Sequence, residues 1–382
     1  MNDPKKTAYG IETAAVHAGR KPDPATGAVT QAISTSTTFE RDRDGEFSRG
    51  YTYVRDNNPN RGALEDCLCA LEGGAEAVAF SSGMAAAYAV FQALSPGDHV
   101  ILHRDMYYGV RELIHGVFAR WGLTHTVVDM RDSVQVRQSC RPQTRLLWLE
   151  TPTNPLIEVV AIAPMAQVAR EVGALLLCEN TFATPALQRP LELGADLVVH
   201  SLTKYLSGHS DSMGGTVVVK QRGEFSQRLR EFQQTGGAVL APFDCWLTLR
   251  GIETLPVRMR AHCENARRVA EFLSGHEKVG AVHFPGLAAD PGHEAAAKQM
   301  RDFGGMLSFE IRGGRAEAFA VAARLKVITR ATSLGGTHSL IEHRASIEGP
   351  QTRAPESLLR LSVGLEDADD LVADLEQALQ AE

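Results

Sequence analysis

The sequence predicts an α/β protein with a large, mainly parallel sheet and a smaller α+β region towards its C-terminal end. Between about residues 77 and 219, short apolar runs alternate with stretches that have the spacing of amphipathic helices. This alternation is typical of βαβ units, whose parallel strands are buried on both faces. A break containing Gly and Pro at 236–242 then precedes two helical segments and further strands. The break indicates a second, smaller unit.

The elements of the large sheet follow one another along the chain. Each apolar run is short and bounded by polar or turn-forming residues, so we interpret the runs as strands. Helices are predicted between most of them, for example at 84–94 and 164–172. The predicted strands are 77–80, 99–102, 125–128, 146–149, 174–177, 196–199 and 216–219.

The start of the chain lacks regular periodicity and is rich in Gly, Thr, Ser and Arg. Irregular segments of this length are usually functional or wrap a neighbouring subunit. We therefore predict an N-terminal arm over 1–60 that is either functional or wraps a neighbouring subunit, a large domain over 61–240 and a small domain over 241–382. The elements predicted for the small domain are helices at 243–255, 261–273 and 367–379 and strands at 306–311 and 360–363.

Composition excludes several classes of protein. The chain is 44% hydrophobic and 22% charged with a formal net charge of −7, so neither nucleic acid nor an anionic membrane is an expected partner. No apolar run reaches the roughly 18 residues that span a bilayer, and the polar N-terminus does not resemble a signal peptide. The six cysteines show no metal-ligand spacing, so we expect reduced thiols, no metal site and a cytoplasmic protein.

A lysine stands at the end of one predicted strand. Lys204 follows the run 196–199 closely and lies beside Ser201 and Thr203. One interpretation is a surface lysine in a polar turn. The other is an amine withdrawn from water at the carboxyl end of a strand, where ligands bind in α/β sheets and where such an amine condenses with a carbonyl. Ser201 and Thr203 are then spaced to donate hydrogen bonds to an anion.

Other strand ends supply matching groups. Gly83 and Met84 open a helix, so their backbone amides can approach an anion. Glu179 follows a strand, where it either caps the next helix or pairs with a protonated pyridine nitrogen. Asn154 follows another strand and offers an amide to a ring hydroxyl. Together with Lys204, these groups describe a site for pyridoxal 5′-phosphate (PLP).

Ordered motifs over nearly the whole length strengthen this interpretation. They occupy 51–55 with 58–59, 71–74, 82–85, 150–155, 180–185, 198–211, 249–255, 333–336 and 359–364. In these segments the chain resembles the Cys/Met-metabolism family of PLP enzymes, which includes cystathionine γ-synthases, γ-lyases and β-lyases, methionine γ-lyases and O-acylhomoserine sulfhydrylases. The resemblance implies PLP-dependent transferase fold type I, which is like that of aspartate aminotransferase, and a large domain that binds PLP.

The resemblance also implies roles for individual residues. Lys204 binds the cofactor covalently and later shuttles protons, while Tyr107 stacks on the ring and assists proton transfer, unless it is merely an aromatic residue at a helix start. Tyr53 and Arg55 reach the phosphate from the neighbouring subunit, which implies active sites shared in a homotetramer built as a dimer of dimers. The other implied cofactor contacts are Gly83, Met84, Ser201 and Thr203 at the phosphate, Asn154 at the ring oxygen and Glu179 at the ring nitrogen.

Substrate binding is implied for a second group of residues. Arg360 and Ser333 hold the substrate carboxylate, a task suited to the fork of a guanidinium group. Arg360 lies between apolar residues, where an unpaired charge would be costly. His338 and Arg111 border the substrate side chain, although His338 has the alternative of a supporting role outside direct contact.

Three positions depart from the family's usual pattern. Glu179 stands where aspartate is usual, and His338 stands where enzymes active at Cγ usually have glutamate. In the segment 107–112, the family's usual arginine falls at position 112. This chain has Glu112 there and carries its arginine one residue earlier, as Arg111. These departures leave the substrate open.

The expected function is γ-elimination or γ-replacement on a homoserine-derived or other γ-substituted amino acid, such as cystathionine or an O-acylhomoserine. Within the same class, the alternatives are a cystathionine β-lyase and a γ-lyase for an unusual substrate such as canavanine. Aminotransfer is disfavoured because the lysine segment matches the lyases. A non-catalytic regulator that keeps the fold is the alternative from another class.

Overall fold

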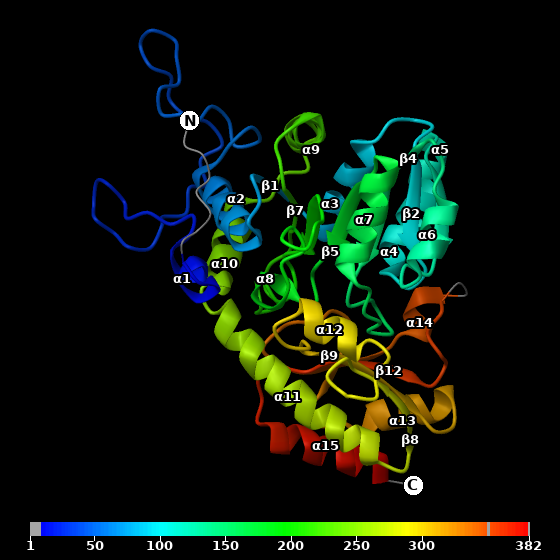
Figure 1. The fold of residues 1–382 in the computed structure, drawn as a ribbon. Coiled ribbons are helices and arrows are strands. Elements are labelled where there is room, and N and C mark those ends of the chain that lie inside the picture. Colours follow the sequence, from blue (N-terminus) through cyan, green and yellow to red (C-terminus); the bar gives the residue numbers. More distant parts are fainter. Residues whose placement is uncertain (1–8, 350–351, 381–382) are drawn as a thin grey trace.

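A computed structural model of the chain describes residues 9–349 and 352–380 (Figure 1). The elements are arranged around two sheets. The long helix α11 (Leu255–Gly275) starts beside the core of the first sheet and continues along one side of the second. The first sheet has seven strands and the second has five. In the described ranges no helix is long and apolar enough to cross a membrane.

The seven-stranded sheet contains every strand predicted for the large unit. Its spatial order is β1-β7-β6-β5-β4-β2-β3. Strands β2 to β6 pair in parallel, whereas β7 is antiparallel to both β6 and β1. The connection from β6 to β7 is a loop and not a crossover helix, which explains the reversal of direction. The bounds are β1 Glu76–Phe80, β2 His99–His103, β3 Thr124–Val128, β4 Thr144–Glu150, β5 Leu175–Glu179, β6 Leu197–Ser201 and β7 Gly215–Val219.

Helices cover both faces of this sheet. Successive strand residues belong to opposite cores: Leu176 packs on one face, whereas Leu177 packs on the other. The first core includes α2 (Pro59–Glu72), α6 (Ser133–Ser139), α7 (Ile162–Val172) and α10 (Pro242–Ile252). The second includes α3 (Gly83–Gln92), α4 (Tyr108–Glu112), the π-helix Leu113–Phe118 and α9 (Glu224–Thr235). The short helices α5 (Ala119–Trp121) and α8 (Thr184–Leu187) complete this unit.

The second sheet has the order β10-β11-β12-β9-β8 and is antiparallel except for the β10–β11 pair. Its apolar core includes residues of α11, α13 and α15. Strands β9 and β12 match the prediction, whereas β8, β10 and β11 were not predicted. The bounds are β8 Val279–His283, β9 Met306–Ile311, β10 Thr329–Arg330, β11 Leu340–His343, β12 Leu358–Ser362, α12 His293–Gln299, α13 Arg315–Arg324, α14 Ala345–Glu348 and α15 Ala368–Gln380. The division into domains near residue 240 stays a prediction; α10, which follows that point, packs against α2.

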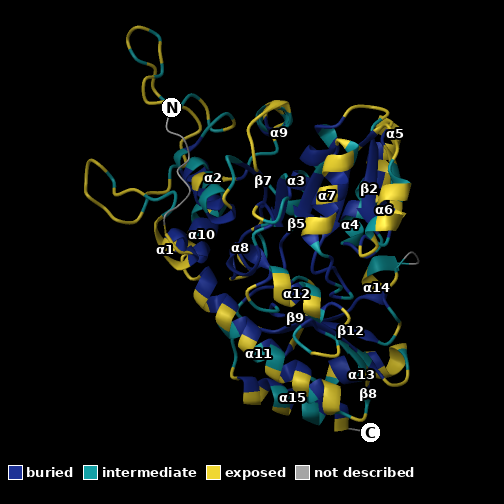
Figure 2. Cartoon of the chain, in the orientation of Figure 1, coloured by how far each residue is buried: buried dark blue, intermediate teal, exposed yellow. Residues whose placement is uncertain are grey.

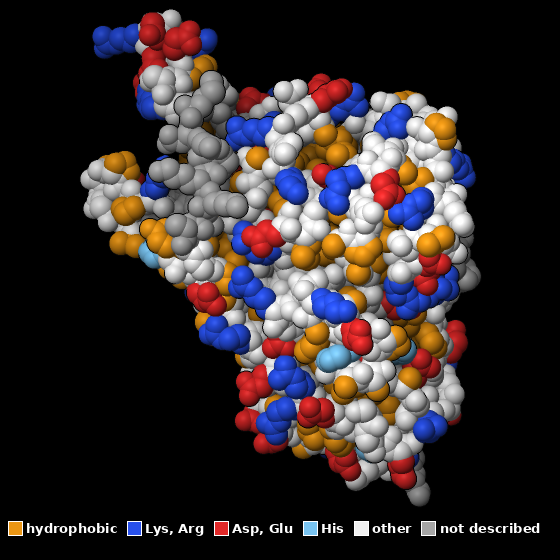
Figure 3. Space-filling model, viewed as in Figure 1, with side chains coloured by type: hydrophobic (Ala, Val, Ile, Leu, Met, Phe, Trp, Pro, Cys, Tyr) orange, Lys and Arg blue, Asp and Glu red, His pale blue; other side chains and the backbone are white. Residues whose placement is uncertain are grey.

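The N-terminal segment leaves the body of the molecule. After α1 (Ile11–His17), the chain forms two irregular loops that stand out from the rest (Figure 1), and these loops are largely exposed (Figure 2). The irregularity agrees with the predicted arm, and contact with a neighbouring subunit stays a prediction. Figure 3 shows acidic and basic side chains interspersed over the visible face, so the net charge of −7 is not gathered in one patch there.

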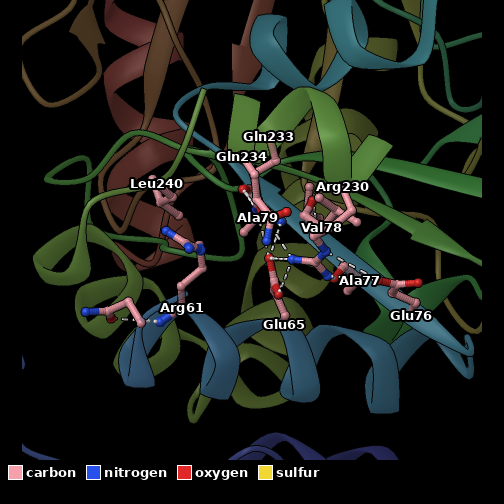
Figure 4. A network of polar contacts seen from close by, with 12 residues as sticks. Arg61, Glu65, Glu76, Ala77, Val78, Ala79, Arg230, Gln233, Gln234 and Leu240 are labelled. Carbon is pink, nitrogen blue, oxygen red and sulfur yellow. Dashed lines mark hydrogen bonds and ion pairs between the residues drawn. The ribbon is translucent and has the colours of Figure 1, made fainter. Parts of the chain in front are cut away.

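A polar network joins the arm to the large sheet. Arg230 of α9 lies 2.8 Å from Glu65 of α2 and 3.0 Å from Glu76 of β1, and Gln233 adds a hydrogen bond to Glu65 (Figure 4). One turn earlier in α2, Arg61 donates hydrogen bonds to the backbone carbonyls of residues 54 and 55 at 2.9 and 3.1 Å. The end of the arm is therefore fixed on α2.

Candidate active site

A cavity of about 400 Å³ lies where the carboxyl ends of β4, β5 and β6 meet the second sheet. This is the edge at which open α/β sheets bind ligands. Ten of the fourteen predicted site residues line it. They are Gly83, Met84, Tyr107, Asn154, Glu179, Ser201, Thr203, Lys204, Ser333 and Arg360.

One end of the cavity suits an anion. Gly83 is the first residue of α3, and the Ser82 side chain caps that helix by accepting from the Ala85 amide at 3.0 Å. The amides of Gly83 and Met84 lie in the first turn, where a helix offers no internal acceptor. A Cβ at Gly83 would lie 3.1 Å from the Cβ of Ser201, so glycine allows the helix to begin beside that hydroxyl. Two amides and a hydroxyl thus converge where a phosphate would bind.

The hydroxyl of Thr203 is tied to the neighbouring backbone. It donates to the Gly214 carbonyl at 3.3 Å and accepts from the Gly214 amide at 3.1 Å. This pair of bonds fixes the turn that carries Lys204. A contact between Thr203 and phosphate stays a prediction.

Lys204 projects into the cavity from the turn after β6. Its Nζ donates to Ser333 Oγ at 2.8 Å, which joins the two sheets across the cavity. Burial, followed by the charge of Arg360, lowers the pKa of the Lys204 amine to about 8. Ser333 has a φ of 81°, a conformation that residues other than glycine rarely adopt. The amine is therefore held in place and is partly neutral near physiological pH, as reaction with a carbonyl requires.

Two carboxyl groups lie side by side beneath the cavity. Glu150 ends β4 and is the register partner of Glu179, which ends β5. Glu150 accepts the backbone amide of Tyr107 at 2.8 Å, and the Thr181 hydroxyl donates to Glu179. Burial raises the pKa of both carboxyls, and the neighbouring carboxylate of Glu179 raises that of Glu150 further. A cation facing Glu179 would relieve this crowding of negative charge, as a protonated pyridine nitrogen does.

Tyr107 stands at the entrance to α4. Its ring lies 5.0 Å from that of Tyr108 in an edge-on arrangement. Burial raises the pKa of the Tyr107 phenol, so the group keeps its proton at neutral pH and can donate it. Stacking of Tyr107 on a cofactor ring stays a prediction.

The opposite end of the cavity is cationic. Arg360 of β12 donates to the side chain of Asn154 at 2.9 Å and to the carbonyl of Ser333 at 3.1 Å. Burial lowers the pKa of Arg360 to about 10, which still leaves it charged at neutral pH. Its Nε is buried without a partner among the described residues, so a donor remains for a carboxylate.

Four predicted residues do not line the cavity within one chain. Tyr53 is 46% exposed, and Arg55 donates to the Gln234 carbonyl at 2.6 Å. His338 is exposed on the loop before β11. Arg111 lies on α4, and its Nε and Nη2 are buried without partners in the part of the chain that the structure describes. The roles of these four residues stay predictions.

Sequence reasoning missed several groups that line the cavity. Glu150 and Thr181 stand at recognised strand ends, so their positions could have indicated them. Glu342 and Arg344 gave no such signal, because β11 and its continuation were not predicted. The remaining polar or aromatic groups missed are Ser82, Tyr108, Trp148, Phe182 and Thr332.

Fold and cavity together define a class of protein: a PLP-dependent enzyme of fold type I. The profile of the family described as Cys/Met metabolism PLP-dependent enzyme matches residues 12–380. The chain belongs to this family, and its cofactor is pyridoxal 5′-phosphate.

Relatives and a solved structure agree with this assignment. Over 376 residues the chain is 50% identical to a cystathionine gamma-synthase of Mycobacterium leprae, with 97% of both chains covered. It is 45% identical over 378 residues to a cystathionine beta-lyase of Coxiella burnetii, again with 97% of both covered. The crystal structure of metB from Corynebacterium glutamicum superposes with a TM-score of 0.96 at 45% identity and covers 99% of both chains.

The residues present fit the cofactor. The first turn of α3 and Ser201 suit its phosphate, Lys204 suits its aldehyde and Glu179 suits its ring nitrogen. When bound, the cofactor supplies a cationic conjugated ring that withdraws electrons from the α-carbon of an amino acid. These residue assignments stay proposals, whereas the family match shows both the family and the cofactor.

We expect Glu179→Asp to retain activity and Glu179→Gln to lower kcat by about 100-fold, because an amide cannot balance the charge of a protonated ring nitrogen. Steady-state kinetics and a pH titration of the cofactor absorbance test this. Glu171→Gln, a change at an exposed ion pair, serves as the matched control. A fully active Gln variant would refute the assignment of Glu179.

The lowered pKa of Lys204 predicts its reactivity in the cofactor-free protein. Only the neutral amine acylates, so the rate of Lys204 acetylation should rise with pH and reach half its limit near pH 8. Peptide mass spectrometry follows the label, with exposed Lys220 as the internal reference for reagent reactivity. A midpoint near 10.5, the ordinary value for lysine, would contradict a withdrawn amine.

Proposed function

We propose that the chain catalyses elimination or replacement at Cγ of a homoserine-derived amino acid, such as cystathionine or an O-acylhomoserine. The observation that carries this proposal is the contact of Lys204 Nζ with Ser333 Oγ at 2.8 Å, beside the carbonyl that accepts from Arg360. A substrate held by its carboxylate at Arg360 would present its Cα to the amine of Lys204.

The chain's own residues account for the proton transfers that such a reaction needs. Arg360 orients the substrate through its carboxylate, and Ser333 aims the amine. A neutral Lys204 takes a proton from Cα of the substrate, and the protonated amine can return a proton to a nearby substrate carbon such as Cβ. A pKa of about 8 allows the amine both to accept and to donate a proton near neutral pH. Tyr107, which keeps its proton, would assist these transfers. Buried Trp148 and Leu334 among the lining residues exclude water.

The relatives support chemistry at Cγ and keep one alternative open. The mycobacterial relative at 50% identity is named a cystathionine gamma-synthase, and a Bacillus subtilis relative at 43% identity is named a cystathionine gamma-lyase. The Coxiella burnetii relative is named a cystathionine beta-lyase. Cleavage of cystathionine at Cβ is therefore the second candidate.

We further propose a cytoplasmic homotetramer in which Tyr53 and Arg55 of one chain reach the phosphate end of a neighbour's cavity. The two side chains lie on the exposed arm and not in the cavity of their own chain. An apolar hollow beside α3 and α9, lined by Met84, Tyr88 and Phe232 among others, offers a surface for such a contact. The free cysteines suit a reducing compartment.

Product analysis separates the candidates. With cystathionine, cleavage at Cγ gives 2-oxobutyrate, whereas cleavage at Cβ gives pyruvate. With O-succinylhomoserine and cysteine, replacement gives cystathionine. We expect 2-oxobutyrate or cystathionine to form, and no turnover by Lys204→Ala.

Canavanine belongs in the same substrate panel, because its leaving group differs from the acyl groups. Pyruvate as the main product would replace the proposal with a β-lyase. Absence of turnover on every γ- or β-substituted amino acid would contradict both enzymatic candidates.

A further inference from the structure

Four charged side chains form a ladder behind the cationic end of the cavity. Arg360 Nη2 donates to Glu342 Oε2 of β11 at 2.9 Å, and Arg344 Nη1 donates to the same oxygen at 2.6 Å. Arg344 also donates through Nε and Nη2 to Glu348 Oε1 of α14 at 3.2 and 2.9 Å. The ladder thus alternates in sign from Arg360 to Glu348.

The ladder belongs to the wall of the cavity. Glu342, Arg344 and Arg360 all line it, and they are only 7%, 3% and 3% exposed. The guanidinium of Arg344 also lies 5.7 Å from the ring centroid of Tyr108, another lining residue. Arg344 is therefore fixed on three sides, by two carboxylates and an aromatic ring.

The position of Glu342 raises an electrostatic difficulty. A carboxylate 2.9 Å from Arg360 competes with any other carboxylate for that guanidinium. If Glu342 were paired with Arg360 alone, the two charges would cancel, and the site would have little attraction for a substrate carboxylate. In the structure, Arg344 makes the shorter contact with the shared oxygen.

We propose that Arg344 is a positioning residue for substrate binding: it holds the negative charge of Glu342, so that Arg360 keeps a cationic face for the carboxylate of an amino acid. The unpaired Nε of Arg360, within the described residues, is the donor left for that carboxylate. Arg344 and Arg360 contact the same oxygen of Glu342, so their two charges lie close together. Burial and this neighbouring charge of Arg344 lower the pKa of Arg360. This inference rests on the proposed function, in which Arg360 binds the substrate carboxylate.

A pair of probes isolates the carboxylate. L-norvaline and n-butylamine share an amine and an alkyl chain, but only norvaline carries a carboxylate, and neither has a leaving group. Their dissociation constants are measured on the cofactor-loaded enzyme from the change in cofactor absorbance. We expect Arg344→Gln to weaken norvaline binding about tenfold, the size of one charge-assisted hydrogen bond, and to leave butylamine binding within about twofold.

A double variant distinguishes charge balance between Glu342 and Arg344 from a purely structural role of Arg344. The double variant Glu342→Gln with Arg344→Gln lacks both the competing carboxylate and its counter-charge, so norvaline affinity should return to within about threefold of the wild type. Arg344→Lys should retain most of that affinity, because it keeps the charge. Arg267→Gln, a change at a surface ion pair with Asp302, is the control and should change neither constant.

Several results would overturn the inference. If Arg344→Gln weakened the binding of norvaline and butylamine equally, Arg344 would have a structural role. If it left the dissociation constant of norvaline unchanged, Arg344 would have no role in substrate binding. Failure of the double variant to recover affinity would also contradict charge balance. If Arg344→Gln does not fold, Glu342→Gln alone decides: norvaline binding at least as tight as in the wild type supports the inference, and weaker binding refutes it.

A further variant tests separately whether the substrate carboxylate binds at Arg360. Arg360→Gln should abolish the preference for norvaline over butylamine. If that preference survives, the substrate carboxylate does not bind at Arg360. The proposed function then fails at this residue, and the inference about Arg344 falls with it for a distinguishable reason.

Discussion

The candidate active site depends on one set of contacts between the two sheets. Arg360 on the second sheet donates to Asn154 beyond the end of β4, and Lys204 after β6 donates to Ser333 on the segment before β11. These bonds fix a cationic group of one unit opposite the amine of the other. Neither sheet alone carries both groups, so the proposed chemistry requires that the two sheets remain packed together.

Burial of charge is the cost of this arrangement, and balance between charges offsets it. Glu150 and Glu179 lie in register beneath the cavity, while Arg360 and Arg344 face Glu342 at its other end. Buried charges are tolerated when opposite charges or hydrogen bonds accompany them. In the proposed function, a protonated cofactor ring at Glu179 and a substrate carboxylate at Arg360 would add further opposite charges to this wall.

The large sheet and much of the candidate site could be predicted from the sequence, because the patterns that indicate them lie within short segments of the chain. Apolar runs indicated all seven strands of the large sheet, and the groups predicted at their carboxyl ends, such as Lys204 and Glu179, line one cavity. The ladder behind Arg360 could not be predicted in this way. Strand β11 has only four residues, of which Glu342 and His343 are polar, and its contacts join segments that local patterns cannot bring together. The roles proposed for Tyr53 and Arg55 involve a neighbouring chain, so neither local sequence patterns nor contacts within one chain bear on them.

We propose above all that Lys204 binds the cofactor covalently at the junction of the two sheets. Reduction of the cofactor-loaded enzyme with sodium borohydride, followed by proteolysis and mass spectrometry, tests it directly. The account predicts that the mass of the reduced cofactor is found on the peptide that contains Lys204, and that Lys204→Arg abolishes this label. A label on another lysine, such as Lys220, or its persistence in the Lys204→Arg variant, would contradict the account.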